Sequence, residues 1–117
     1  MEDIDYTGLT AEQINIINTI INDFDFKSVK QYMNNTNWKW SIRTNPNSFD
    51  YAYYNPTIND IKHKLTEYLI DGFKENNKSN NNETPIFISA GGFSVYVWPN
   101  NECQVYFSVT DYFYEID

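Results

Sequence analysis

The chain has 117 residues, 41% of them hydrophobic, and a formal net charge of −8. This length predicts one domain, residues 1–117, with a hydrophobic core of its own. The composition excludes a disordered tail, and the sequence has no stretch of about 18 apolar residues that would cross a membrane. The negative charge argues against direct binding of nucleic acid, because phosphates are bound by clustered lysine and arginine.

The N-terminus and the cysteine content predict where the protein resides. The first residues are acidic and lack the basic and apolar regions of a signal peptide. The single cysteine, Cys103, has no partner for an internal disulfide. Secreted domains of this size often depend on disulfides, so we expect a cytoplasmic protein.

Two helices are predicted near the start of the chain. Thr10 and Gln13 have the spacing of a capping box, and isoleucines at helical spacing predict a helix over 11–23. Asp25 is placed to cap a second, short helix over 26–35. An asparagine-rich segment follows that helix and ends it, because asparagine tolerates the left-handed backbone of helix ends.

The middle of the chain predicts a hairpin followed by a long helix. Apolar and polar residues alternate over 38–43 and again over 49–53, which favours a strand pair. An apolar stripe predicts a helix over 58–75, opened by a second capping box. Gly72 lies within this stripe, where it either permits close packing or marks fraying of the helix.

The last third of the chain predicts β-structure. The polar, low-complexity segment near 75–84 is expected to be a flexible surface loop. A long strand over 86–98, interrupted by Gly91-Gly92, is predicted to form a hairpin with a strand over 103–110. An aromatic and acidic tail, 111–117, follows.

These elements predict an α+β fold, with an antiparallel sheet of about four strands and two main helices on one of its faces. The apolar stripes of 14–24 and 58–73 are expected to pack on a sheet built from the strands near 38–43, 86–98 and 103–110.

Charge is unevenly distributed along the chain. Residues 1–26 carry −6, residues 27–78 carry +3, and residues 79–117 carry −5 with no lysine or arginine. Either the acidic ends fold back onto the basic middle and are partly neutralised, or they form an anionic face that steers the protein to a basic partner.

Aromatic and glycine motifs have two interpretations each. Trp38 and Trp40 share one face of a predicted strand, either as core residues or as an aromatic platform for a base or a protein side chain. Gly91-Gly92 precedes a strand and lacks the features of a phosphate-binding loop. It is either a bulge in the long strand or a point of close approach to a ligand.

No catalytic or metal-binding motif is evident. His63 is the only histidine and lies off the apolar stripe of its helix, so we expect a solvated residue. Cys103 is in phase with the apolar positions of its strand and is expected to be buried. We therefore predict no enzymatic activity, no metal site and no cofactor.

Several short motifs resemble those of a widespread family of small bacteriophage- and prophage-encoded accessory proteins of unknown function. The motifs are Phe24-Asp25-Phe26 with Val29 and Met33, Asn37-Trp38-Lys39-Trp40, Pro56-Thr57 at a helix start, and Gly91-Gly92-Phe93 before a closing hairpin. The resemblance spans about residues 20–110 and implies a phage accessory protein in a host cell. Small acidic phage proteins include inhibitors of host defence, anti-CRISPR proteins among them, so the resemblance implies such a role by analogy.

Two functions are therefore hypothesised. The first is an anti-CRISPR-like inhibitor that binds a host protein, such as a nucleic-acid-binding defence component, at its nucleic-acid-binding surface. Its expected contact residues are acids and tyrosines at both ends of the chain: Asp3, Asp5, Asp23, Asp25, Asp111, Tyr112, Tyr114 and Glu115. The alternative is a small-ligand binder, such as a sponge for a nucleotide signal, that uses Trp38, Trp40, Gly91 and Gly92.

Overall fold

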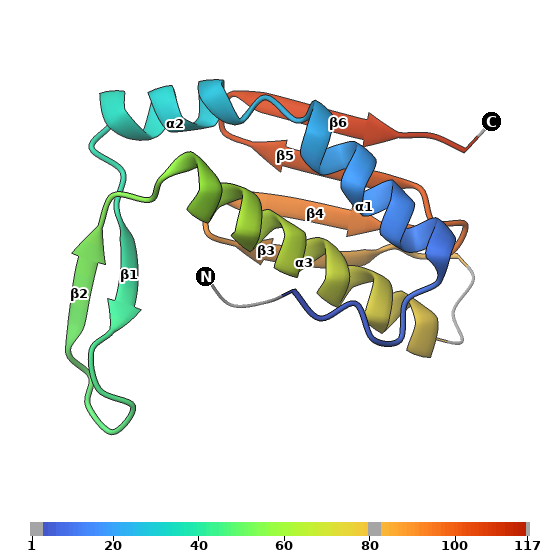
Figure 1. Ribbon diagram of the computed structural model, residues 1–117, viewed down its shortest axis with the longest axis horizontal. Coiled ribbons are helices and arrows are strands. Elements are labelled where there is room, and N and C mark those ends of the chain that lie inside the picture. The colour runs from blue at the N-terminus through green and yellow to red at the C-terminus, as the bar shows by residue number, and fades with distance from the viewer. Residues whose placement is uncertain (1–3, 80–82, 117) are drawn as a thin grey trace.

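The computed structural model describes residues 4–79 and 83–116, which form three helices and two antiparallel sheets (Figure 1). The helices are α1 (Ala11–Asp23), α2 (Phe26–Asn35) and α3 (Ile58–Lys78). The strands are β1 (Trp40–Arg43), β2 (Tyr51–Tyr54), β3 (Ile86–Ala90), β4 (Phe93–Val97), β5 (Cys103–Phe107) and β6 (Thr110–Tyr114). The expected α+β class and a four-stranded antiparallel sheet are confirmed. Besides the two main helices, the structure has the predicted short helix α2 and a second sheet, which was not expected.

Short-range side-chain contacts set the helix starts. The Thr10 hydroxyl accepts a hydrogen bond from the backbone N–H of Gln13, whose side chain accepts one in return from the backbone N–H of Thr10. Thr57 and Asp60 form the same capping box at the start of α3. Asp25 caps α2. Each pair satisfies backbone donors that have no partner within the helix, so the predicted helix starts are confirmed.

The predicted helix over 58–75 is longer than expected, because α3 continues to Lys78. The polar segment after it therefore begins at Ser79, and residues 80–82 of the expected loop lie outside the described residues. Gly72 is buried within α3, where a Cβ atom would lie only 2.8 Å from Cγ2 of Val97. The glycine thus permits close packing of α3 on β4, and it does not mark fraying.

The larger sheet is an antiparallel meander in the order β3-β4-β5-β6. Gly91 and Gly92 have φ angles of 60° and 90° and form the two-residue turn between β3 and β4. Such turns need positive φ, which glycine adopts without strain. The expected single strand over 86–98 with a bulge is therefore wrong. Likewise, the chain reverses within the expected strand over 103–110, and most of the tail forms β6.

The smaller sheet is the β1–β2 hairpin alone, with Trp40 paired to Tyr54 at its base. The hairpin projects to one side of the molecule, next to the start of α3 (Figure 1). Within the two strands only Trp40 is buried. The expectation that the strand near 38–43 joins the main sheet is therefore wrong: its alternation reflects two tryptophans packed on the body of the protein.

The core lies between the larger sheet and the helices. Helices α1 and α3 lie over one face of this sheet (Figure 1). Alternate residues of β4 and β5 are buried against them, and the residues between are only partly buried. The buried strand residues are Phe93, Val95, Val97, Cys103, Val105 and Phe107. Among the described residues, no helix is both long and apolar enough to span a lipid bilayer.

Candidate functional site

The two tryptophans and the two glycines highlighted by the sequence come together at the base of the hairpin. The indole Nε1–H of Trp40 donates a hydrogen bond to the carbonyl oxygen of Gly91 at 3.2 Å. A Cβ atom on Gly92 would lie 2.5 Å from Cε2 of Phe107 and 3.0 Å from Cζ2 of Trp38. The glycine turn is therefore packed closely between aromatic rings.

This packing gives the four residues a structural role at the core. Trp40 is 8% exposed, and Trp38 packs against the rings of Tyr32 and Phe107. The two tryptophans therefore do not form an open platform for stacking. Trp40 and Gly91 do line the wall of a pocket, whereas Trp38 and Gly92 do not.

The acidic residues near the N-terminus are spread over several local structures, and Asp3 lies outside the described residues. Asp5 accepts hydrogen bonds from the hydroxyl and the backbone N–H of Thr7, which lower the pKa of its carboxyl group. Hydrogen bonds from the hydroxyl and backbone N–H of Ser28 lower the pKa of Asp25 in the same way. Both carboxylates therefore stabilise local turns and caps.

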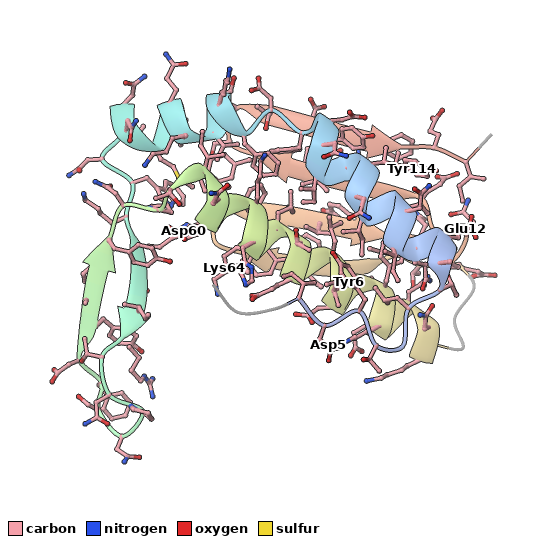
Figure 2. The ribbon with its side chains drawn as sticks, in the orientation of Figure 1. Asp5, Tyr6, Glu12, Asp60, Lys64 and Tyr114 are labelled. Carbon is pink, nitrogen blue, oxygen red and sulfur yellow. The ribbon has the colours of Figure 1, made fainter. Side chains whose placement is uncertain are left out.

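The predicted patch of acids and tyrosines at the C-terminal end is divided between two faces of β6. Tyr112 and Tyr114 pack against the core, and Tyr114 lies next to α1 (Figure 2). Asp111 and Glu115 occupy the alternate positions and are exposed. Successive residues of a strand point to opposite faces, so these four side chains do not form one patch.

A side-chain contact next to the C-terminal strand joins the two acidic segments of the chain. The hydroxyl of Tyr112 lies 3.5 Å from a carboxylate oxygen of Asp23, at the end of α1. Partial burial raises the pKa of Tyr112, and the nearby Asp23 carboxylate adds to this shift. Ion pairs form within α3. After the hydrogen bonds from Thr7, the charge of Lys74 also lowers the pKa of Asp5, so this acid of the N-terminal segment lies near a cation of the basic middle.

A different surface carries a group of aromatic side chains that are exposed or partly exposed. The face of the larger sheet opposite α1 and α3, which we call the open face, is covered by no other helix or strand of the described residues (Figure 1). Five aromatic rings point to it from all four strands or their ends: Phe87, Tyr96, Trp98, Tyr106 and Phe113. Phe87 is 52% exposed and Phe113 is 43% exposed.

These five rings form one connected cluster. The ring centroids of Phe87 and Tyr96 are 4.7 Å apart, and Tyr96 lies 5.8 Å from Trp98 and 6.1 Å from Tyr106. Trp98 meets Phe113 edge to face at 6.2 Å. Mutual contact restricts the rotamers of the rings before any partner arrives, so less side-chain entropy is lost on binding.

The described residues of the strands that form the open face, with the turns between them, include carboxylates and no lysine or arginine. Asp111 pairs with Tyr106 across β5 and β6, so their side chains share this face. Glu102 is opposite Trp98, whose backbone N–H donates to the Glu102 carbonyl oxygen at 2.9 Å. The sequence of residues 79–117 contains no lysine or arginine. The face therefore combines aromatic rings with carboxylates at its edges.

No family model, curated protein or solved structure is significantly similar to the chain.

The alternating pattern of β4 and β5 contains a signal for the open face that the predicted site residues do not include. An antiparallel sheet that exposes one face to water normally alternates apolar and polar residues. In β4 and β5 the positions between the buried residues include Tyr96 and Tyr106, and Trp98 continues the pattern after β4. Aromatic residues at these expected polar positions indicate a surface with a binding role.

Of the two side chains considered for catalysis, His63 contacts a carboxylate and Cys103 is buried. His63 Nε2 lies 2.8 Å from a carboxylate oxygen of Glu67, one turn further along α3. Cys103 is 0% exposed, and burial raises the pKa of its thiol to about 12. Within the described residues, no group of three or more histidine, cysteine, aspartate or glutamate side chains is placed to hold a metal ion.

Proposed function

We propose that this chain is a binding protein, without catalytic activity of its own, that attaches to a basic surface of another protein through its open face. The single observation that carries the proposal is the cluster of five aromatic rings on strands that lack lysine and arginine. Tyrosine and tryptophan are favoured at interfaces because they bury a large ring and keep a polar group for hydrogen bonding.

The chemistry of the open face favours arginine and lysine in the partner. A guanidinium or ammonium group is attracted to the face of an aromatic ring, and Asp111 and Glu102 add carboxylates at the edges. A nucleic acid would stack its bases on the same rings, but its phosphates would meet only negative charge. We therefore propose a protein partner and no direct contact with nucleic acid or membrane.

The same chemistry supports a more specific proposal about the partner. Protein surfaces that hold nucleic acid are basic and rich in arginine. A chain with a net charge of −8 and an open face free of cations is suited to cover such a surface. We propose, as the phage resemblance implies, that the protein inhibits a nucleic-acid-binding defence protein of the host, in the host cytoplasm, by occupying that surface.

The first test uses the indole N–H signals of the three tryptophans in an NMR titration. Trp98 belongs to the open face, whereas Trp38 and Trp40 belong to the base of the hairpin. An arginine-rich peptide should shift the Trp98 signal, and added salt should weaken binding, because exposed charges are screened. A glutamate-rich peptide and a single-stranded oligonucleotide should leave that signal unchanged; binding of either would contradict the proposal.

Matched variants then locate the surface. Phe113→Ser should weaken peptide binding about tenfold, the effect of losing roughly 1.4 kcal/mol. Phe49→Ser is the control, because Phe49 is 87% exposed on the hairpin loop and away from the open face. A host protein captured by the wild type should be lost with Phe113→Ser, retained with Phe49→Ser and displaced by its own nucleic acid. Equal capture by both variants would place the interface elsewhere.

A further inference from the structure

A second feature, independent of the open face, is a pocket of about 240 Å³ where the hairpin meets the body of the protein. It is lined by Trp40, Ser41 and Tyr54 from the hairpin, Lys64 and Tyr68 from α3, and Gly91 from the β3–β4 turn. Lys64 lies in the N-terminal half of α3, which is near the hairpin (Figure 2). Three segments that are distant in the sequence thus form its wall.

Three of the six residues that line this pocket are aromatic, and the others are serine, lysine and glycine. Trp40 and Tyr54 meet edge to face, with ring centroids 6.2 Å apart. A Cβ atom on Gly91 would lie 2.9 Å from the Tyr68 hydroxyl, so the absence of a side chain at Gly91 leaves room for that phenol. Pockets for drug-sized ligands hold about 300–1,000 Å³, so this one suits a smaller molecule with a single ring.

The pocket holds polar groups that are able to donate hydrogen bonds to an anion. Within the described residues, the hydroxyls of Tyr54, Tyr68 and Ser41 make no hydrogen bond, whereas the indole N–H of Trp40 is taken by Gly91. Burial raises the pKa of Tyr68, with smaller effects from its charged neighbours, so this phenol stays protonated and is able to donate. Lys64 adds the one ammonium group among the lining residues.

An acidic ligand group would have to compete with one carboxylate for Lys64. The Lys64 ammonium lies 3.5 Å from a carboxylate oxygen of Glu67, and the other Glu67 oxygen lies 2.8 Å from His63. Both side chains of the Lys64–Glu67 pair are partly exposed, and such pairs contribute little. Glu67 would keep His63 as its partner when Lys64 turns to a ligand.

We propose that this pocket binds a small aromatic anion, one ring that carries a carboxylate or a phosphate. The ring would pack against Trp40 and Tyr54, and the anionic group would contact Lys64 and the Tyr68 hydroxyl. Such a ligand would touch the hairpin and α3 together, so binding would also fix the hairpin against the body. An intact nucleotide is larger than this volume favours, and the pocket uses only two of the four residues first assigned to a ligand.

The probes are phenyl phosphate and benzoate, with benzyl alcohol and inorganic phosphate as controls that lack the charge or the ring. The indole N–H of Trp40 reports on this pocket, and that of Trp98 reports on the open face. We expect a saturable shift of the Trp40 signal with at least one aromatic anion, no shift of the Trp98 signal, and slower hydrogen exchange in the hairpin. Each control should bind at least about tenfold more weakly.

Lys64→Gln should weaken binding of the aromatic anion about tenfold and leave any weak binding of benzyl alcohol unchanged. Lys74→Gln is the matched control, since Lys74 lies on the same helix and lines a different pocket. Thermal melting verifies that both variants fold, and Tyr68→Phe tests the hydroxyl of Tyr68 as a hydrogen-bond donor separately.

The proposal is overturned if neither aromatic anion shifts the Trp40 indole signal, if benzyl alcohol or inorganic phosphate binds as tightly, or if both lysine variants behave alike. None of these outcomes bears on the open face, because Trp98 reports on that surface separately.

Discussion

The indole nitrogen of Trp40 donates its hydrogen bond to the carbonyl oxygen of Gly91, a residue 51 positions further along the chain. This contact joins the base of the projecting β1–β2 hairpin to the turn between β3 and β4. A hairpin of two short strands is marginally stable by itself. The Trp40–Gly91 contact therefore sets the position of the hairpin and shapes the pocket beneath it.

Replacing the indole tests this anchoring role. Trp40→Phe keeps a ring but removes the donor, so we expect the free energy of unfolding to fall by about 1–2 kcal/mol. The amide protons of 41–43 and 51–53 should exchange faster in the folded protein. Trp38→Phe is the control, because the Trp38 indole donates no hydrogen bond to the described residues. Urea denaturation and hydrogen exchange measure both effects; equal hairpin exchange in the two variants would disprove the anchor.

The β3–β4 turn should tolerate no side chain at its second glycine. Gly92→Ala adds a Cβ that would meet Phe107 and Trp38, and φ at this position is 90°. We expect a loss of stability of about 2–4 kcal/mol, from backbone strain together with overpacking. Gly8 has the same φ, but a Cβ there would meet nothing within 4 Å. Gly8→Ala should therefore lower the free energy of unfolding only by the backbone strain, roughly 1 kcal/mol. Equal losses of stability for Gly8→Ala and Gly92→Ala in denaturation experiments would refute the close packing around Gly92.

The contact between α3 and β4 predicts that Gly72→Ala destabilises the wild-type protein but stabilises a variant in which Val97 is replaced by alanine. Gly72→Ala improves helix propensity by about 1 kcal/mol, but its Cβ would lie 2.8 Å from Cγ2 of Val97. In the wild type we expect a net destabilisation of about 1 kcal/mol, because overpacking exceeds the propensity gain. In the Val97→Ala variant the clashing methyl group is absent, so Gly72→Ala should raise the free energy of unfolding. A double-mutant cycle by chemical denaturation measures this coupling, and additive effects would contradict it.

The buried thiol predicts a pH dependence. Burial raises the pKa of Cys103 to about 12, whereas the thiol of an unfolded cysteine has a pKa of about 8.5. Above the lower value the unfolded state loses a proton that the folded state keeps, so stability should fall as the pH rises through 9 and 10. Cys103→Ala should remove this part of the decline. A thiol reagent at about pH 8 should react only at the rate of unfolding; rapid reaction with the folded protein would contradict the burial.

The helix starts were predictable from the sequence alone. Thr10 with Gln13 and Thr57 with Asp60 are hydrogen-bonded partners only three residues apart, so the pattern of residue types contains the interaction. The end of α2 was also predictable from nearby residues, because Asn37 adopts the left-handed backbone expected there, with φ of 54°. The alternation of β4 and β5 likewise predicted which of their side chains share a face.

The tertiary structure decided which surfaces meet and which remain open. Alternation defines two faces of a strand but does not say whether a second layer covers either one, so the aromatic cluster around Tyr96 was not recognised as an exposed surface. The separation of the β1–β2 hairpin from the main sheet, and the meeting of Trp40 with Gly91 and Lys64 around one pocket, depend on contacts between distant segments. Such contacts form where apolar faces pack together, and local residue patterns fix the faces without fixing their partners.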